Sequence, residues 1–329
     1  MAYTTIDKPS DYFNVSLWTG DNNARTISGV GFQTNWLWEK CRSNTYSHIL
    51  IDSVRGKTKQ IRSDTTALET TNAQGVTAFN SDGYVLGTQD EFANNDNTFV
   101  GWNWKESATA GFDIVSYTGN SSARTISHNC GAVPKMMIVK KLSDGDNWSV
   151  YHQATGAGNF TILNTTAASA GSSTMWNNTT PTSSVFSLGN KGEVNASSQT
   201  FIAYLFAEKK GYSKFGSYRG NNNANGTFVY LGFKPAFIMV KCSDAGESYR
   251  HWAMFDNKRS SFNGQLSQIS ANNNALENTG EPAKIDLVAN GFKLRGTSGE
   301  TNDGGQAFIY IAFAESPFVT STGIPATAR

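Results

Sequence analysis

A threefold internal repeat constrains this chain of 329 residues more than any other feature of its sequence. A block of eleven residues around Gly20, beginning Leu17-Trp18-Thr19 and ending Arg25-Thr26-Ile27, recurs around Gly119 and more loosely around Gly220. The three glycines are 99 and 101 positions apart (119 − 20 and 220 − 119). Self-similarity at a fixed period indicates that one structural unit is used repeatedly along the chain.

Two further blocks follow each glycine in the same order. The second contains Lys40 in the first copy, within Trp-Leu-Trp-Glu-Lys, and its counterparts end at Lys140 and Lys241. The third block closes each copy with a long apolar run. We therefore predict three tandem homologous domains with short extensions at both ends. Their expected limits are an N-terminal arm at 1–10, repeats at 11–107, 111–209 and 213–318, and a C-terminal tail at 319–329.

The residue pattern within each copy predicts strands. Charged residues make up only 16% of the chain, so Asn, Ser and Thr carry the polar balance, and these side chains disfavour helix interiors. Clusters of Gly, Asn and Asp separate short apolar runs, which is typical of strands joined by turns. In the middle copy the expected strands are 112–118, 123–128, 135–141, 148–152, 159–163, 184–188 and 200–208. The predicted fold class is all-β, with three tandem β-sandwich (jelly-roll-like) domains of about 100 residues.

Aromatic residues indicate where the cores lie. The pairs Trp36/Trp38 and Trp102/Trp104 are each spaced two apart, so each pair shares one face of a strand, and we expect these faces to be buried. The closing run of each copy is apolar on both faces and should form a central strand. Across the copies we expect two sets of equivalent interior positions, namely Trp38, Val139 and Val240, and Trp104, Phe206 and Phe313.

The sequence contains none of the usual catalytic signatures. It lacks a phosphate-binding loop, a dinucleotide glycine fingerprint, a His-Glu-x-x-His motif and a Gly-x-Ser-x-Gly elbow. The three cysteines, Cys41, Cys130 and Cys242, are far apart and odd in number, which favours reduced structural thiols over disulfides or a zinc site. We therefore predict no enzyme, no catalytic residues, no cofactor and no metal. Carboxylates distant in sequence could still meet in space.

One metal hypothesis follows from the repeat. Asp52, His152 and Asp256 end corresponding strands, so packing around a threefold axis could bring them together as ligands. The alternative is three strand ends that face water in separate places.

A tryptophan in a polar loop is the candidate for ligand binding. Trp176 lies outside any strand pattern, followed by Asn177, Asn178 and Thr179. An exposed indole could stack on a sugar while the amides and the hydroxyl bond its hydroxyl groups. The alternative is that Trp176 folds back as a lid over its sandwich.

Charge and hydropathy limit the remaining partners. The net charge is +1 with no long basic run, which disfavours nucleic-acid binding, and no apolar stretch is long enough to insert in a membrane. The first residues lack the basic and apolar regions of a signal peptide, so we expect the protein to stay in the cytoplasm or to leave by lysis.

The repeat blocks resemble structural proteins of tailed, mainly marine, bacteriophages, usually described as tail-fibre or virion proteins with a SPRY or concanavalin-like sandwich. The matching segments are 52–56, 112–120, 134–140, 212–218, 312–318 and 326–329. This resemblance implies a protein assembled in the host cytoplasm and exposed on the exterior of the virion. It implies no enzyme and gives no binding residues to carry over.

The combined expectation is a non-enzymatic virion surface protein, a tail fibre or fibre-like appendage that presents loops to a host-surface glycan. A capsid decoration protein that docks on capsomers is the main alternative, and a glycan depolymerase is the second. Expected partners are other tail or capsid proteins, and a homo-oligomer within the particle. We also expect at least one terminus to be ordered by contact with another virion chain or a neighbouring copy.

Overall fold

Short antiparallel strands form nearly all the regular structure, which confirms the all-β prediction. The computed structural model describes residues 3–260, 263, 266–279 and 285–326. The first segment, 11–107, and the residues before it contain η1 (Pro9–Asp11), β1 (Phe13–Thr19), β2 (Arg25–Ile27), β3 (Trp36–Cys41), β4 (Ile49–Asp52), β5 (Lys59–Gln60), β6 (Thr70–Thr71), β7 (Val76–Asn80), β8 (Gly83–Leu86), α1 (Asp90–Ala93) and β9 (Thr98–Trp104).

The other two segments follow a similar order. The middle segment, 111–209, contains β10 (Phe112–Thr118), β11 (Arg124–Ser127), β12 (Pro134–Lys141), β13 (Ser149–His152), β14 (Asn159–Ile162), β15 (Ala170–Gly171), β16 (Val185–Leu188), α2 (Gly192–Asn195) and β17 (Thr200–Ala207). The third segment, 213–318, contains β18 (Ser213–Arg219), β19 (Phe228–Tyr230), β20 (Phe233–Cys242), β21 (Ala253–Asp256), β22 (Ile269–Ser270), β23 (Ile285–Val288), β24 (Gly291–Leu294) and β25 (Ala307–Pro317).

Each segment builds one large sheet in which the closing strand is central. The orders are β1-β9-β3-β4, β10-β17-β12-β13-β14-β15 and β18-β25-β20-β21-β22. The closing strand is therefore central, as predicted, and in each sheet it lies between the first strand and the strand of the second sequence block. Smaller sheets of two or three strands, β2-β8-β7, β11-β16 and β19-β24-β23, accompany them.

The central strands are buried on both faces because each face belongs to a different apolar cluster. In β17, Ile202, Tyr204 and Phe206 enter one cluster, whereas the alternating Phe201, Ala203 and Leu205 enter another. The strand period of two explains this division. The second cluster lies within the segment, between its large sheet and its small sheet, and the other two segments have corresponding clusters.

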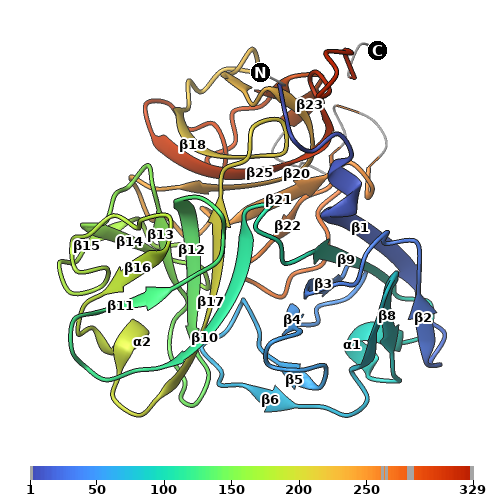
Figure 1. Ribbon diagram of the computed structural model, residues 1–329. Coiled ribbons are helices and arrows are strands. Elements are labelled where there is room, and N and C mark those ends of the chain that lie inside the picture. Colours follow the sequence, from blue (N-terminus) through green and yellow to red (C-terminus); the bar gives the residue numbers. More distant parts are fainter. Residues whose placement is uncertain (1–2, 261–262, 264–265, 280–284, 327–329) are drawn as a thin grey trace.

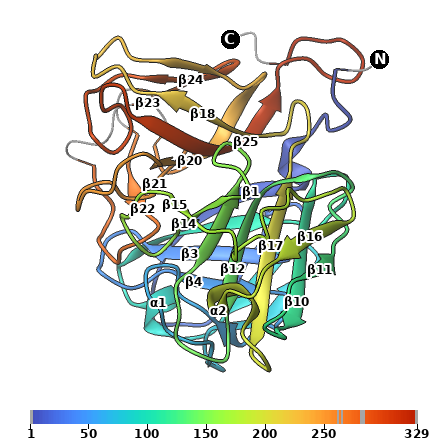
Figure 2. The same ribbon diagram turned by 90° about the vertical axis from the view of Figure 1, so that its left-hand side faces the viewer.

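The first cluster is shared by all three segments. It contains Trp36, Trp38, Trp102 and Trp104 of the first segment together with residues of the middle and third segments, among them Phe206 and Phe313. Figure 1 shows the three segments as three lobes around this centre, with the first in blue to teal, the middle in green to yellow and the third in orange to red. In the side view the third segment lies above the other two (Figure 2). The burial of the tryptophan pairs is confirmed, and the existence of three independent sandwich domains stays a prediction.

One of the two predicted sets of equivalent positions is wrong by one residue. Trp104, Phe206 and Phe313 pair with Trp36, Met136 and Phe237, and all of them lie in the shared cluster, so this set is confirmed. Trp38 faces the shared cluster, whereas Val139 and Val240 face the inner clusters of their own segments. A shift of one residue moves a side chain to the opposite face of a sheet, which is the source of the error.

The corrected alignment exposes an unusual buried acid. Strand pairing places Glu39, opposite Ile49, at the position of Val139 and Val240. Its side chain is fully buried, and both carboxylate oxygens lack a hydrogen-bond partner. Burial raises the pKa of Glu39 well above its usual value and so favours the neutral form of the carboxyl group.

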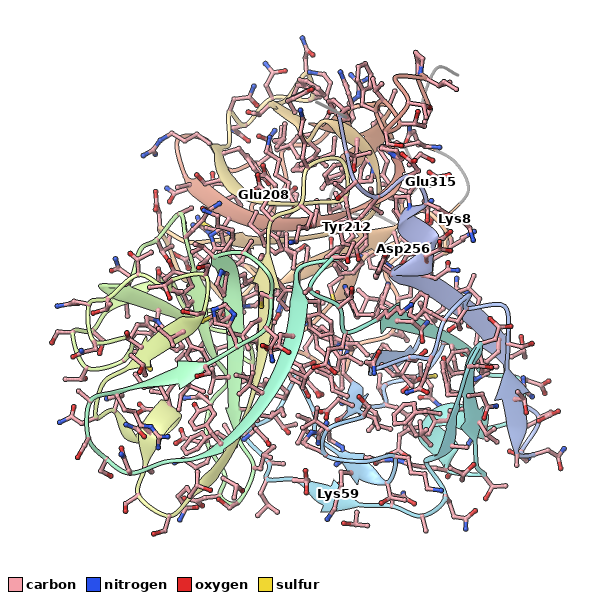
Figure 3. The ribbon with its side chains drawn as sticks, in the orientation of Figure 1. Lys8, Lys59, Glu208, Tyr212, Asp256 and Glu315 are labelled. Atoms are coloured by element: carbon pink, nitrogen blue, oxygen red, sulfur yellow. The ribbon has the colours of Figure 1, made fainter. Side chains whose placement is uncertain are left out.

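The N-terminal arm and the C-terminal tail bond to the third segment and to each other. The Tyr3 hydroxyl donates to the Gly232 carbonyl at 2.6 Å, and the Ser321 hydroxyl donates to the Asp7 carboxylate. In Figure 3, Lys8, which precedes η1, and Glu315 of β25 lie on the same side of the molecule. The first segment therefore closes onto the third within this chain. Residues 1–2 and 327–329 lie outside the described part, and ordering of a terminus by another virion chain stays a prediction.

Substitution of Phe313 tests the packing of the shared cluster. Its ring contacts Phe13 and Trp104 of the first segment and Phe206 of the middle segment, with centroid separations of 5.3, 5.7 and 5.9 Å. We expect Phe313→Ala to lower the free energy of unfolding by about 3–5 kcal/mol in chemical denaturation. The matched control is Phe228→Ala, where the side chain is 45% exposed and the change should stay within about 0.5 kcal/mol. Equal effects of the two substitutions would contradict this packing.

The unpartnered carboxyl group of Glu39 should lower the free energy of unfolding of the natural protein. We expect Glu39→Val to raise the free energy of unfolding by about 1–3 kcal/mol, because it removes two unpartnered polar atoms from an apolar site. Glu39→Gln keeps unpartnered polar atoms and should gain much less. The reverse change, Val139→Glu, should be strongly destabilising. A loss of stability in Glu39→Val would show that the carboxyl group has a partner in solution.

Candidate functional site

The strand-end residues Asp52, His152 and Asp256 are buried and joined to neighbouring segments. The Asp52 carboxylate accepts a hydrogen bond from the Tyr204 hydroxyl at 2.7 Å, and the Asp256 carboxylate accepts one from the Trp102 indole at 3.0 Å. Among the described residues these three do not come together as a group of possible metal ligands, and all three are buried, so both earlier alternatives, a shared metal and exposure to water, are wrong. Each residue links its own segment to the next one around the centre.

His152 makes the remaining link of this set. Its Nε2 lies 3.2 Å from the Tyr310 carbonyl oxygen of β25 and donates to it, since a carbonyl can only accept. The three contacts run from the first segment to the middle, from the middle to the third, and from the third back to the first.

A second set of contacts repeats around the centre in the same way. Each segment places an indole or imidazole N–H against a backbone carbonyl of a neighbouring segment. The contacts are Trp148 to Arg62 at 2.8 Å, Trp252 to Ile162 at 3.0 Å and His48 to Ser270 at 3.0 Å. The cyclic order gives each of these three buried N–H groups an acceptor. Two other indoles of the shared cluster, Trp36 and Trp104, have buried N–H groups without a hydrogen-bond partner in the described structure.

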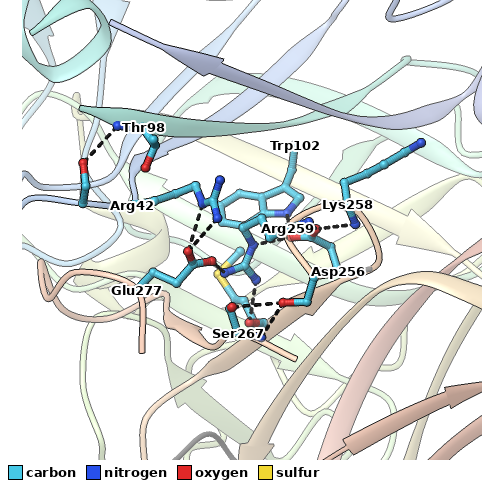
Figure 4. Close-up of polar contacts among 11 residues, drawn as sticks. Arg42, Thr98, Trp102, Asp256, Lys258, Arg259, Ser267 and Glu277 are labelled. Carbon is cyan, nitrogen blue, oxygen red and sulfur yellow. Dashed lines mark hydrogen bonds and ion pairs between the residues drawn. The ribbon is translucent and has the colours of Figure 1, made fainter. Parts of the chain in front are cut away.

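The junction of the third and first segments holds a buried ionic network (Figure 4). Arg259 bonds Asp256 at 2.5 Å and Glu277 at 2.7 Å, and Arg42 of the first segment bonds the second oxygen of Glu277 at 2.8 Å. The Trp102 ring lies 5.5 Å from the Arg259 guanidinium. Burial acts to raise the pKa of Asp256, but the charge and hydrogen bonds of Arg259 outweigh burial and lower it. This network is structural, since every charge is used inside the protein.

A polar cleft of about 730 Å³ opens between the middle and third segments. Its described lining is rich in hydroxyl and amide groups and consists of Ala154, Thr155, Asn159, Ser169, Ser217, Tyr218, Arg219, Ser243, Asp244, Ala307 and Ile309. The Ser169 N–H donates to the Ser243 carbonyl at 2.9 Å and so joins the two segments beside the cleft.

Exposed charges lie at the third-segment side of this cleft. Arg219 and Asp244 are 3.8 Å apart, with side chains 71% and 44% exposed, so both can bond a ligand. Asn159 lies on the opposite side, where its amide donates to the Thr155 carbonyl at 2.7 Å. Dispersed donors and acceptors around a concave surface suit recognition of a hydroxyl-rich ligand.

The prediction that Trp176 is exposed is wrong. Its side chain is fully buried in the core of the middle segment, with its ring 6.1 Å from that of Tyr151, so it cannot stack on a sugar. Its indole N–H donates to the Asn159 backbone carbonyl at 3.0 Å. Trp176 therefore supports a residue of the polar cleft from behind, in keeping with the alternative that it folds back.

The residues that follow Trp176 are exposed. Asn177 and Asn178 have positive φ values of 53° and 48°, and the Thr179 hydroxyl donates to the Asn177 carbonyl at 2.7 Å. A Cβ at Gly158 would lie 3.5 Å from the Asn178 side-chain oxygen, which places this loop beside Asn159. A ligand-binding role for Asn177, Asn178 and Thr179 stays a prediction.

Sequence reasoning missed the cleft because its two sides come from different segments. Arg219 lies beside the repeat glycine Gly220, and Asp244 follows the second block of the third copy, but neither position carries a recognisable motif. Only the packing of β18 and β20 against the middle segment brings these residues opposite Asn159.

A second cluster of polar side chains lies inside the middle segment. The ligand-type atoms of Asp113, His128 and Cys130 all lie within 4.8 Å of one another, and the three residues are buried. Burial, followed by the neighbouring Asp113 carboxylate, raises the pKa of the Cys130 thiol. Burial and a hydrogen bond to Asp113 raise the pKa of Glu106 to about 7. The sequence signal for this cluster is the His-x-Cys spacing at 128–130. The number of cysteines and their separation do not reveal it.

Comparison with known proteins gave one family. A model described as a domain of unknown function, DUF7483, matches residues 8–317, a range that includes all three segments. No curated protein matches the chain.

None of the helices in the described part of the chain is long and apolar enough to cross a membrane.

The buried histidines predict acid sensitivity. Burial lowers the pKa of His48 to about 3 and that of His152 to about 4, against about 6.5 in the unfolded chain. Because the folded values are lower, their contribution to stability is complete above about pH 6.5 and is lost as the pH falls toward about 4 for His152 and about 3 for His48. Over this window each histidine should remove up to about 1.4 kcal/mol of unfolding free energy per pH unit. Denaturant titrations at several pH values should show this slope.

Substitution of the two histidines tests whether they cause the pH dependence of the unfolding free energy. His48→Gln and His152→Gln should each flatten the pH dependence between about pH 4 and 6.5, whatever their effect at neutral pH. An unchanged slope in the double variant would show that other groups cause the acid lability.

Proposed function

Because its match to DUF7483 spans residues 8–317, the chain belongs to that family of unknown function, and we propose that it is a non-enzymatic, glycan-binding surface protein of a bacteriophage particle. The observation that carries the binding role is the polar cleft between the middle and third segments. The virion assignment is supported by the resemblance of the repeat blocks to phage structural proteins.

The lining of the cleft favours a sugar over an apolar ligand. Sugars present many hydroxyl groups, each of which can donate and accept a hydrogen bond. Asn159, Arg219 and Asp244 supply an amide, a guanidinium and a carboxylate from the two sides, and Ser and Thr hydroxyls lie between them. The exposed loop at 177–179 lies next to Asn159 and extends the polar surface.

The same lining favours binding over cleavage. Most glycosidases use two carboxyl groups placed on either side of the scissile bond. Among the described residues that line this cleft, Asp244 is the single acidic side chain. A binding protein needs no second carboxylate, so we place the depolymerase alternative behind attachment.

Rigid presentation of the cleft fits attachment. Its two sides are held by contacts between the segments, including the bond of the Gln153 amide to the Phe215 carbonyl at 2.5 Å. A preformed site loses less conformational entropy when a ligand binds. Several copies on one particle would add avidity to weak single-site affinity.

Binding to an array of bacterial surface polysaccharides tests this function. We expect the full chain to retain a subset of these glycans, and Asp244→Ala and Asn159→Ala each to weaken binding about tenfold, about 1.4 kcal/mol, by removing a hydrogen bond at the cleft. The control is Glu315→Ala, which removes an exposed ion pair with Lys234 outside the cleft. Retention of no glycan, or unchanged affinity in both cleft variants, would contradict the proposal.

Cryo-electron microscopy of intact particles tests the location. Density for this chain at a tail or fibre tip would support host attachment. Density spread over the capsid shell would instead support the decoration alternative, and absence from particles would contradict the virion assignment.

A further inference from the structure

The polar cluster inside the middle segment has the donor set of a transition-metal site. Asp113 belongs to β10, and His128 and Cys130 follow β11, so the three side chains come from the large and the small sheet of one segment. A carboxylate oxygen, an imidazole nitrogen and a thiolate sulfur are the ligand types that proteins use for Zn²⁺. Each of the three residues is at most 5% exposed, so the cluster is enclosed rather than spread over a surface.

The hydrogen bonds of His128 already set the geometry that a metal ligand needs. Its Nε2 lies 3.1 Å from the Thr182 carbonyl and must donate to it, so Nδ1 carries the lone pair of the neutral ring. That lone pair accepts a long hydrogen bond from the Cys130 backbone N–H at 3.3 Å, which a metal ion would have to replace. A second-sphere bond from the far nitrogen to a backbone carbonyl is typical of metal-binding histidines.

Asp113 and Cys130 are also held in place, and each still has lone pairs that could bind a metal ion. The Asn129 N–H fixes one carboxylate oxygen of Asp113 at 2.6 Å, and the Cys130 sulfur makes a single long contact, 3.6 Å, to the Leu205 carbonyl. The carboxyl group of Glu106 bonds Asp113 and is a further oxygen donor beside the site. Bonds to zinc of about 2.0–2.3 Å require the donor atoms to approach to about 4 Å or less, which small side-chain rotations can supply.

Only the middle segment has this donor set among the three corresponding positions. Strand pairing places Asn14 of the first segment and Lys214 of the third at the position of Asp113. Neither the residues after β2, 28–31, nor those after β19, 231–232, include a histidine or a cysteine. The common fold therefore does not need an acid, a histidine and a cysteine here. Three potential ligands have collected at one place in one copy.

We propose that Asp113, His128 and Cys130 bind one Zn²⁺ ion, with Glu106 or a water molecule as the fourth ligand. Binding transfers the Cys130 thiol proton to solvent and forms a sulfur–zinc bond, with no change in oxidation state. The site is independent of the polar cleft and of the glycan-binding function, and it would stabilise the contact between the two sheets of the middle segment.

Cobalt substitution tests the site directly. The full chain, stripped of metal, is titrated with Co²⁺ while absorption is recorded. We expect one Co²⁺ per chain, visible ligand-field bands and a near-ultraviolet thiolate-to-cobalt band, all removed when Zn²⁺ displaces the cobalt. Zn²⁺ should also raise the melting temperature, since it binds the folded state.

Variants separate this site from other thiols. Cys130→Ser should lose the thiolate band, and Asp113→Asn, which introduces the residue found in the first segment, should weaken Co²⁺ binding at least tenfold while remaining folded by circular dichroism. Cys41→Ser and Cys242→Ser, which alter buried thiols elsewhere, should leave the spectrum unchanged. No saturable Co²⁺ binding, or an unchanged spectrum in Cys130→Ser, would overturn the proposal.

Discussion

The shared apolar cluster is the constraint on which the rest of this structure depends. Each large sheet presents one face to its own small sheet and the other to the two neighbouring segments, so neither face can remain in water. Trp36 illustrates the dependence, because its ring stacks on Tyr204 of the middle segment at 4.4 Å as well as packing on Trp104 of its own. The three segments complete one another, and each one alone would expose a large apolar surface.

Polar groups decide how the segments pack around this cluster. Apolar contact is tolerant of sliding and rotation, whereas a buried N–H group is stabilised only where it meets an acceptor. Lys140 and Lys241 are examples, since each buried ammonium group donates to a carbonyl of the preceding segment, at Thr66 and Thr166. Both residues are fully buried, and burial lowers the pKa of each to about 8. Such contacts fix one relative placement of the segments.

The sequence predicts the strands well, but it does not predict which surfaces of the segments meet. The strands of the middle segment lie within one or two residues of their predicted limits, because alternation and turn residues are local signals. The two-residue strand β15 was not predicted, as it has too little pattern. The polar cleft, the inward position of Trp176 and the contact of Asp113 with His128 and Cys130 depend on which surfaces meet, and no local periodicity carries that information. The position of Val139 shows how a one-residue error reverses a face.

Closure of the third segment onto the first has a consequence for biosynthesis. The contacts that complete the centre join residues more than 200 positions apart, as between Arg42 and Glu277 or Tyr3 and Gly232. Loop closure over such distances is slow, and the N-terminal segment leaves the ribosome long before its last partner. Until the third segment has been synthesised, Trp36 and Trp104 are only partly buried, and the nascent chain exposes an apolar surface. During synthesis, a chain with two completed segments therefore still exposes apolar surface that favours aggregation and chaperone binding.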